Sequence, residues 1–167
     1  LEIIDIHKII YNSLSKNYQV IFKSIESNQY FLMYLSNRDA KNVAMSSEGI
    51  SSAALSTYEL FLNLLQLLRI KIIKAIIKKS QNKIIYEIQF KDKNNKQFSM
   101  FTNNADAIIL SLKSLAYIYI DKKLLIDDII KEHTPVNLDE TFPKKHILKQ
   151  SINSKLNILT SALHECI

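Results

Sequence analysis

The chain has 167 residues, of which 47% are hydrophobic, so it is long enough to bury one core, and we expect one globular domain with a C-terminal extension. The single cysteine, Cys166, excludes an internal disulfide, and no apolar run approaches the roughly 20 residues of a membrane span, so we expect a cytoplasmic protein with no membrane partner. The single glycine excludes a glycine-rich phosphate-binding loop.

The net charge of +6 is concentrated in one segment of the chain. Between Arg69 and Lys96, nine Lys or Arg residues stand against two acids, which gives this segment a charge of +7. A basic surface of this kind attracts nucleic acid or an anionic membrane through counterion release. Lysines on the solvated face of a sheet also prevent strands from pairing edge to edge, so charge alone leaves both interpretations open.

The first half of the chain predicts three strands followed by two helices. Residues 3–12 and 18–24 mix Ile, Val, Tyr and Phe with polar residues and flank a turn-like sequence, so they predict a hairpin, with a third strand over 29–35. The first helix begins at a capping serine and ends at Gly49, a residue suited to a left-handed C-terminal cap. A second helix follows Ser56. Its predicted buried face comprises Leu60, Phe61, Leu64, Leu65 and Leu68.

The basic segment begins a second run of strands. Residues 69–79 fit either a helix with a stripe of lysines or a strand, and the density of β-branched residues favours a strand with a bulge near Ile72 and Ile73. Residues 84–90 alternate apolar and polar side chains, which is typical of a half-buried strand. A turn then leads into a strand over 97–101, so a second meander is expected.

The remaining segment predicts mostly helix. Asn103 caps a helix that passes into the apolar strand 117–120. Asp121 begins a short helix that we expect to reach Lys131, and residues 144–166 repeat apolar side chains at helical spacing. That final helix either packs on the core or pairs with another subunit, which would make the protein a homo-oligomer.

Together these segments predict an α+β fold. A mostly antiparallel mixed sheet, built from two strand meanders and packed by two or three helices, forms a domain over residues 1–131. A linker and a C-terminal helix occupy residues 132–167.

Three acids occupy the same position in three predicted helices. Asp39, Glu59 and Asp106 each lie three residues after an N-cap, where a carboxylate stabilises its own helix start. Brought together, the same acids would hold a divalent cation and support phosphodiester cleavage. The spacing is compatible with both roles and does not identify the metal, for which a cation such as Mg²⁺ is the candidate. The histidines and the cysteine show no spacing typical of a zinc or thiol site.

Three stretches resemble the bifunctional nuclease domain, a family of small α+β proteins. They are the run Ser56-Thr57-Tyr58-Glu59-Leu60-Phe61, the strand pair from Ile70 to Phe90 and, above all, Asn104-Ala105-Asp106-Ala107-Ile108-Ile109-Leu110-Ser111-Leu112 followed by Ala116-Tyr117-Ile118-Tyr119-Ile120. The order of elements also agrees, and the likeness covers about residues 5–128.

The resemblance implies a nuclease that degrades DNA and RNA. Its expected catalytic residues are Asp106, Glu59, Asp39 and Thr57. The lysines expected to contact the phosphate backbone are Lys71, Lys74, Lys78 and Lys79. The alternative is a non-catalytic module on the same fold that binds nucleic acid, another protein or a second copy of itself.

The sequence departs from the family pattern around these acids. Where the family usually has Arg-Pro-Ser before Asp-Ala-Ile, this chain has Asn103-Asn104-Ala105. Where the family has a pattern like Arg-Pro-x-Thr-His-Asp, the arginine and the histidine are replaced by Ala54 and Tyr58. The family's Glu-Ala in the first helix corresponds to Asp39-Ala40. The acids are therefore present, whereas groups that bind phosphate or transfer protons are changed.

Overall fold

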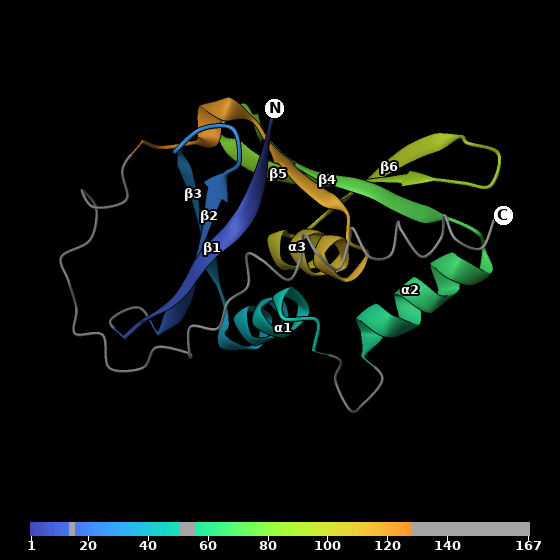
Figure 1. The fold of residues 1–167 in the computed structure, drawn as a ribbon, viewed down its shortest axis with the longest axis horizontal. Helices are drawn as coiled ribbons and strands as arrows, with labels where there is room; N and C mark the ends of the chain where they lie inside the picture. The colour runs from blue at the N-terminus through green and yellow to red at the C-terminus, as the bar shows by residue number, and fades with distance from the viewer. Residues whose placement is uncertain (14–15, 51–55, 128–167) are drawn as a thin grey trace, which may run out of the picture. The chain divides into compact units, whose positions relative to one another are not determined.

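The computed structural model describes residues 1–13, 16–50 and 56–127, and these form a seven-stranded sheet with three α-helices (Figure 1). The strands are β1 (Glu2–Asn12), β2 (Asn17–Ser24), β3 (Tyr30–Leu35), β4 (Lys71–Ser80), β5 (Lys83–Lys91), β6 (Gln97–Thr102) and β7 (Tyr117–Ile120). The helices are α1 (Asn37–Ser47), α2 (Thr57–Leu67) and α3 (Asn104–Lys113), with a 3₁₀ helix, η1 (Lys122–Leu124). The predicted α+β class is confirmed. The linker and helix expected over 132–167 lie outside the described residues, and the limits of the domain stay a prediction.

The sheet joins two antiparallel meanders through one short strand. Its order is β3-β2-β1-β7-β4-β5-β6, so β7 lies between the first strand of each meander. The pair β4–β7 is parallel and the other pairs are antiparallel. A parallel pair needs a crossover connection, and α3 belongs to the segment that brings the chain back to β7.

The predicted bulge in β4 is confirmed and has a packing reason. The register with β5 shifts between Ile72 and Lys74. In a regular strand, Ile72 would face the opposite side from Ala75 and Ile77, because side chains alternate with a period of two. The extra residue brings Ile72 to the same side of the sheet as the other two, where it packs beneath the helices.

The helices lie on one face of the sheet (Figure 1). The main core joins Val43 of α1 and Ile108 and Ile109 of α3 to Phe22 and Ile77 of the sheet, and all five are essentially inaccessible to solvent. Full burial of such a side chain contributes about 1.5–3 kcal/mol. Since α3 has buried residues on most of its circumference, it holds the centre of this layer. No helix within the described residues is both long enough and apolar enough to cross a membrane.

The prediction for the buried face of α2 is wrong for three of its five residues. Leu60, Leu64 and Leu68 are 68%, 49% and 56% exposed, whereas Leu65 is buried and Phe61 is partly buried. Helix α2 lies at the edge of the helical layer and packs one side against α3 and the sheet. Because leucines surround this helix, helical spacing alone does not distinguish its buried side from its exposed side.

Two predicted helix ends have different outcomes. Gly49 has a φ of 66° just after α1, so the predicted left-handed cap is confirmed. The helix predicted to run from Asp121 to Lys131 is wrong in the part that the structure describes. It stops after the single turn of η1, because Ile126 forms a bridge with Tyr30 through two backbone hydrogen bonds of 2.8 Å.

Candidate functional site

The three α-helices begin in the same way. Ser36, Ser56 and Asn103 are extended N-cap residues, and each side chain accepts a hydrogen bond from the backbone N–H of the acid three positions later. These acids are Asp39, Glu59 and Asp106. The predicted N-caps are therefore confirmed for all three helices, and each contributes about 1 kcal/mol to its helix. The carboxylate of Glu59 also accepts the backbone N–H of its N-cap, which completes a capping box, whereas Asp39 and Asp106 accept from the side chains of their N-caps. A catalytic role has to be judged from where each carboxylate lies.

The starts of the three helices meet around one cavity of about 470 Å³, here called the three-helix cavity. It is lined by Arg38, Asp39 and Asn42 of α1 and by Thr57, Tyr58 and Phe61 of α2. Asp106 of α3 and Thr102 at the end of β6 also line it. The fold thus brings together three of the four predicted catalytic residues, Asp39, Thr57 and Asp106.

Asp106 is held by hydrogen bonds on both carboxylate oxygens. Oδ1 accepts the Tyr58 hydroxyl at 2.8 Å, and Oδ2 accepts the Asn103 side-chain amide at 2.7 Å. Burial, and then the hydrogen bond to Asp106, raise the pKa of Tyr58 well above its usual value. Tyr58 therefore remains protonated at neutral pH and donates to Asp106, from a position where the family pattern has histidine.

Asp39 is less constrained than Asp106. Its Oδ2 accepts the Ser36 hydroxyl at 2.8 Å, and its Oδ1 has no hydrogen bond to the described residues. The side chain is half-buried, and Arg38 and Asn42 line the same cavity. Of the two cavity acids, Asp39 has the more available oxygen.

Glu59 does not line the three-helix cavity. Its Oε2 accepts the Ser56 backbone N–H at 2.7 Å, and its Oε1 pairs with Lys113 Nζ at 2.8 Å. The ion pair with Lys113 is the main reason why the pKa of Glu59 falls to about 2. Glu59 therefore fastens the first turn of α2 to the last turn of α3.

The four predicted phosphate-binding lysines do not form one surface. Lys78 pairs with Glu87 at 2.6 Å, and the Lys74 ammonium lies 5.2 Å from the centre of the Tyr119 ring. Both project from the sheet face opposite the helices, because the intervening Ala75 and Ile77 face the helical layer. Lys71 and Lys79 are exposed at opposite ends of β4, about 26 Å apart at a rise of about 3.3 Å per residue.

The cavity acids fit one mode of metal binding. The described residues contain no cluster of three or more His, Cys, Asp or Glu side chains able to hold a metal ion, so the three predicted acids do not form one site. Asp39 and Asp106 are the two acids of the cavity lining. A pair of carboxylates suits Mg²⁺, which commonly takes one or two from the protein and its other ligands from water and substrate phosphate.

Sequence reasoning missed Arg38, Asn42 and Tyr58 as site residues. Arg38 and Asn42 are four residues apart and so share one side of α1. The signal for Arg38 and Tyr58 was their position next to an acid in a first helical turn, and the signal for Asn42 was its spacing of four from Arg38. Three helix starts around one cavity also place the positive ends of three helix dipoles there, which favours an anionic ligand.

One protein family matches most of the chain. The model of the bifunctional nuclease domain matches residues 20–133, which include all three helices, the strands β3 to β7 and part of β2. No curated protein matches the chain. The match covers more than half of the chain and contains every residue that lines the three-helix cavity. The chain therefore belongs to the bifunctional nuclease domain family.

Proposed function

We propose that this protein is a nuclease that hydrolyses phosphodiester bonds of DNA or RNA in the three-helix cavity. The family membership supports a nuclease-like or nucleic-acid-binding function. The observation that carries the proposal is the placement of Asp39 and Asp106 beside Arg38 where three helices begin. A cytoplasmic location belongs to the same proposal, because a single cysteine suits a reducing compartment.

The cavity offers a phosphate group both charge and hydrogen-bond donors. Arg38 supplies a guanidinium whose planar donors match phosphate oxygens, and the Thr57 hydroxyl and the Asn42 amide supply neutral donors. The helix starts add the partial positive charge of their free N–H groups. These groups offset the repulsion between the phosphodiester and the two carboxylates.

In this proposal the two acids share one task, and Asp39 has a second. Asp39 and Asp106 would hold a divalent cation, which supplies an activated water and stabilises charge on the phosphate when bound. Asp106 keeps a fixed orientation because Tyr58 and Asn103 hold both of its oxygens. Oδ1 of Asp39 accepts the proton of the attacking water. The water oxygen bonds to phosphorus, the P–O bond to the leaving oxygen breaks, and solvent protonates that oxygen.

A nuclease assay on purified full-length protein tests the proposal. Fluorescent single- and double-stranded DNA and RNA are incubated with and without Mg²⁺, and Asp106→Asn is the comparison. We expect cleavage by the wild type and a loss of roughly 10²–10⁴ in rate for the variant. Cleavage at the same rate by Asp106→Asn would overturn the assignment of the site. Absence of cleavage of every substrate would overturn the proposed activity.

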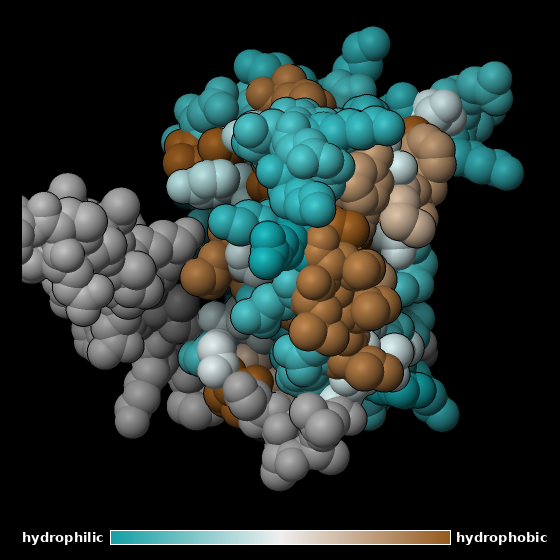
Figure 2. All heavy atoms as spheres, turned by 90° about the vertical axis from the view of Figure 1, so that its right-hand side faces the viewer, coloured by the Kyte–Doolittle hydropathy of each residue, from teal (hydrophilic) through white to brown (hydrophobic). Residues whose placement is uncertain are grey.

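A second candidate function is a protein-interaction or oligomerisation module. The observation that favours it is the outer side of α2, which leaves Leu60, Leu64, Leu67 and Leu68 between 49% and 81% exposed. Figure 2 shows a continuous apolar area on the side of the molecule that carries this helix. Exposed apolar patches of this kind commonly mark contact surfaces, and a second copy of the chain would make a homo-oligomer. Light scattering of the purified protein tests this candidate by measuring its mass in solution.

A further inference from the structure

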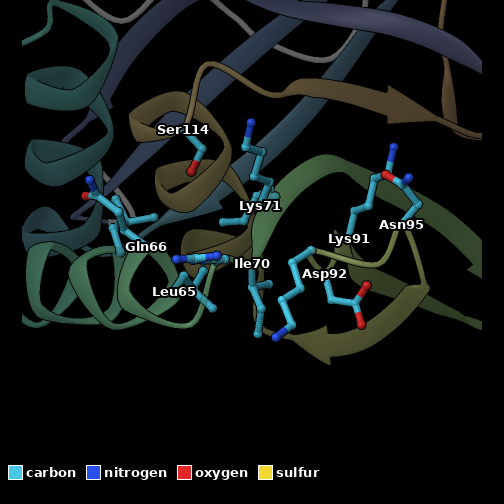
Figure 3. A pocket seen from close by; sticks show the side chains of 12 residues that line it. Leu65, Gln66, Ile70, Lys71, Lys91, Asp92, Asn95 and Ser114 are labelled. Carbon is cyan, nitrogen blue, oxygen red and sulfur yellow. The ribbon is translucent and has the colours of Figure 1, made fainter.

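A second cavity, of about 620 Å³, lies at the other end of α2 (Figure 3). Four cationic side chains line it, and we call it the basic cavity. They are Arg69, Lys71, Lys91 and Lys93. Arg69 and Lys71 flank the start of β4, whereas Lys91 and Lys93 belong to the end of β5 and the turn that follows it. Two segments distant in sequence thus contribute cations to one lining.

The described residues do not balance the charge of this cavity. Asp92 is the one acid in its lining, and its Oδ1 accepts the backbone N–H groups of Asn94 and Lys96, each at 2.8 Å, which closes the turn. None of the four cations forms an ion pair with another described residue. Four like charges around one hollow repel one another, and an anion in the hollow relieves that repulsion.

The lining also has an apolar part. Leu62 and Leu65 of α2 and Ile70 and Ile72 of the following segment contribute to it. Figure 3 shows Leu65 and Ile70 on the same side of the cavity, with Lys91 and Asp92 across from them. A volume of this size lies within the range of about 300–1,000 Å³ typical of small-ligand sites. The combination suits a ligand with an anionic group and a flat apolar part.

We infer that the basic cavity binds a nucleotide unit, with its phosphate among the four cations and its base against the apolar side. The inference rests on the proposed function for the source of that nucleotide, a nucleic-acid strand that also reaches the three-helix cavity. Helix α2 lines both cavities, and its residues Thr57 and Gln66 are about 14 Å apart along the helix at about 1.5 Å per residue. That distance corresponds to about four nucleotides at about 3.4 Å each.

The backbone at Arg69 allows a clean test. Its φ of 56° lies in the left-handed region, where an L-residue is strained by about 1–2 kcal/mol and glycine is not. Arg69→Gly therefore removes one cation without disturbing the fold. Lys16→Gly is the matched control, because Lys16 has a φ of 53°, carries the same charge and lies in the turn between β1 and β2.

The test measures binding of a fluorescent single-stranded oligonucleotide to full-length protein by anisotropy at several salt concentrations. Each phosphate contact to a single strand contributes about 0.7 to the slope of log affinity against log salt. Relative to about 1 M salt, one such contact therefore raises the affinity roughly eightfold at 50 mM salt. We expect Arg69→Gly to lose about that factor and to lower the slope by about 0.7, whereas Lys16→Gly stays within about twofold. Equal losses in the two variants would overturn the inference.

Further arms distinguish the source of the ligand and the two proposals from each other. If a free nucleoside monophosphate competes with the oligonucleotide in the wild type and not in Arg69→Gly, a single nucleotide unit is the ligand of the site. If no nucleoside monophosphate competes even at millimolar concentration, the nucleotide pocket is refuted. If Arg69→Gly weakens binding but the wild type hydrolyses no substrate, this inference is retained and the proposed catalysis is refuted. If the wild type hydrolyses its substrate but Arg69→Gly binds as tightly as the wild type, the proposed catalysis is retained and this inference is refuted.

Discussion

The hydrogen bond between Tyr58 and Asp106 joins α2 to α3 in the lining of the three-helix cavity, and Tyr58→Phe removes it without removing the ring. The hydroxyl donates to a carboxylate at 2.8 Å, and a hydrogen bond to a charged group contributes about 1.5–3 kcal/mol. Asp106 is half-exposed, so water replaces part of the interaction, and we expect a loss of about 1.5 kcal/mol. For a chain of this length this loss lowers the midpoint of thermal unfolding by roughly 3–6 °C.

Tyr86→Phe is the matched control for this prediction. Tyr86 is also half-buried and packs beneath the helices, and its hydroxyl makes no hydrogen bond within the described part of the chain. Burial alone raises the pKa of Tyr86. Circular dichroism should therefore show a change within about 0.5 kcal/mol for the control. If Tyr58→Phe and Tyr86→Phe lower the midpoint equally, the bond to Asp106 contributes nothing and the argument for a preorganised Asp106 fails.

The ion pair of Glu59, the cap of α3 and the exposed side of α2 can each be tested by one substitution. Because the pKa of Glu59 is lowered in the folded state, its contribution to stability is present above about pH 4.5 and is lost as pH falls toward 2. Lys113→Met removes the main cause of this shift, so the free energy of unfolding, measured with urea between pH 6 and 3, should depend less on pH in the variant. A steeper profile would contradict this. Asn103→Ala should cost about 1 kcal/mol by removing the cap of α3, whereas Asn103→Ser should retain most of it; unchanged stability in both would refute the cap. If the protein is an oligomer through α2, Leu67→Lys should lower its mass in light scattering to that of the 19.3 kDa chain, and an unchanged mass would exclude that face.

Local rules predicted the elements and the positions of the acids. Alternation in β5 and the capping serine and asparagine residues are properties of neighbouring residues, so they can be recognised without the fold. The bulge of β4 was also predictable locally, because the adjacent apolar residues Ile72 and Ile73 interrupt the apolar–polar alternation, and the register shifts there.

Partner choice between distant segments was not predictable in the same way. Glu59 resembles Asp39 and Asp106 in sequence, but Lys113 lies 54 residues away and holds Glu59 outside the cavity lining. The lysines of β4 were expected to act together, yet strand alternation and Glu87 separate them. Lys91 and Lys93 join Lys71 in their place because antiparallel pairing puts the end of β5 beside the start of β4.

The exposed side of α2 shows a related limit. Leucine on every side of a helix does not indicate which side is buried, and the fold offers this helix one neighbouring surface. The side that remains open depends on where α3 lies, and α3 is placed by long-range contacts with the sheet.

The central claim is that the acids of the three-helix cavity act on nucleic acid while the third capping acid does not. The most direct measurement is the rate of oligonucleotide cleavage, in one Mg²⁺-containing buffer, by Asp39→Asn, Asp106→Asn and Glu59→Gln, each checked for folding. All three variants neutralise an acid at the same position of a helix start. We predict a loss of roughly 10²–10⁴ for the two aspartates and a rate within about threefold of wild type for Glu59→Gln. Equal losses in all three, or none in the aspartates, would contradict the account.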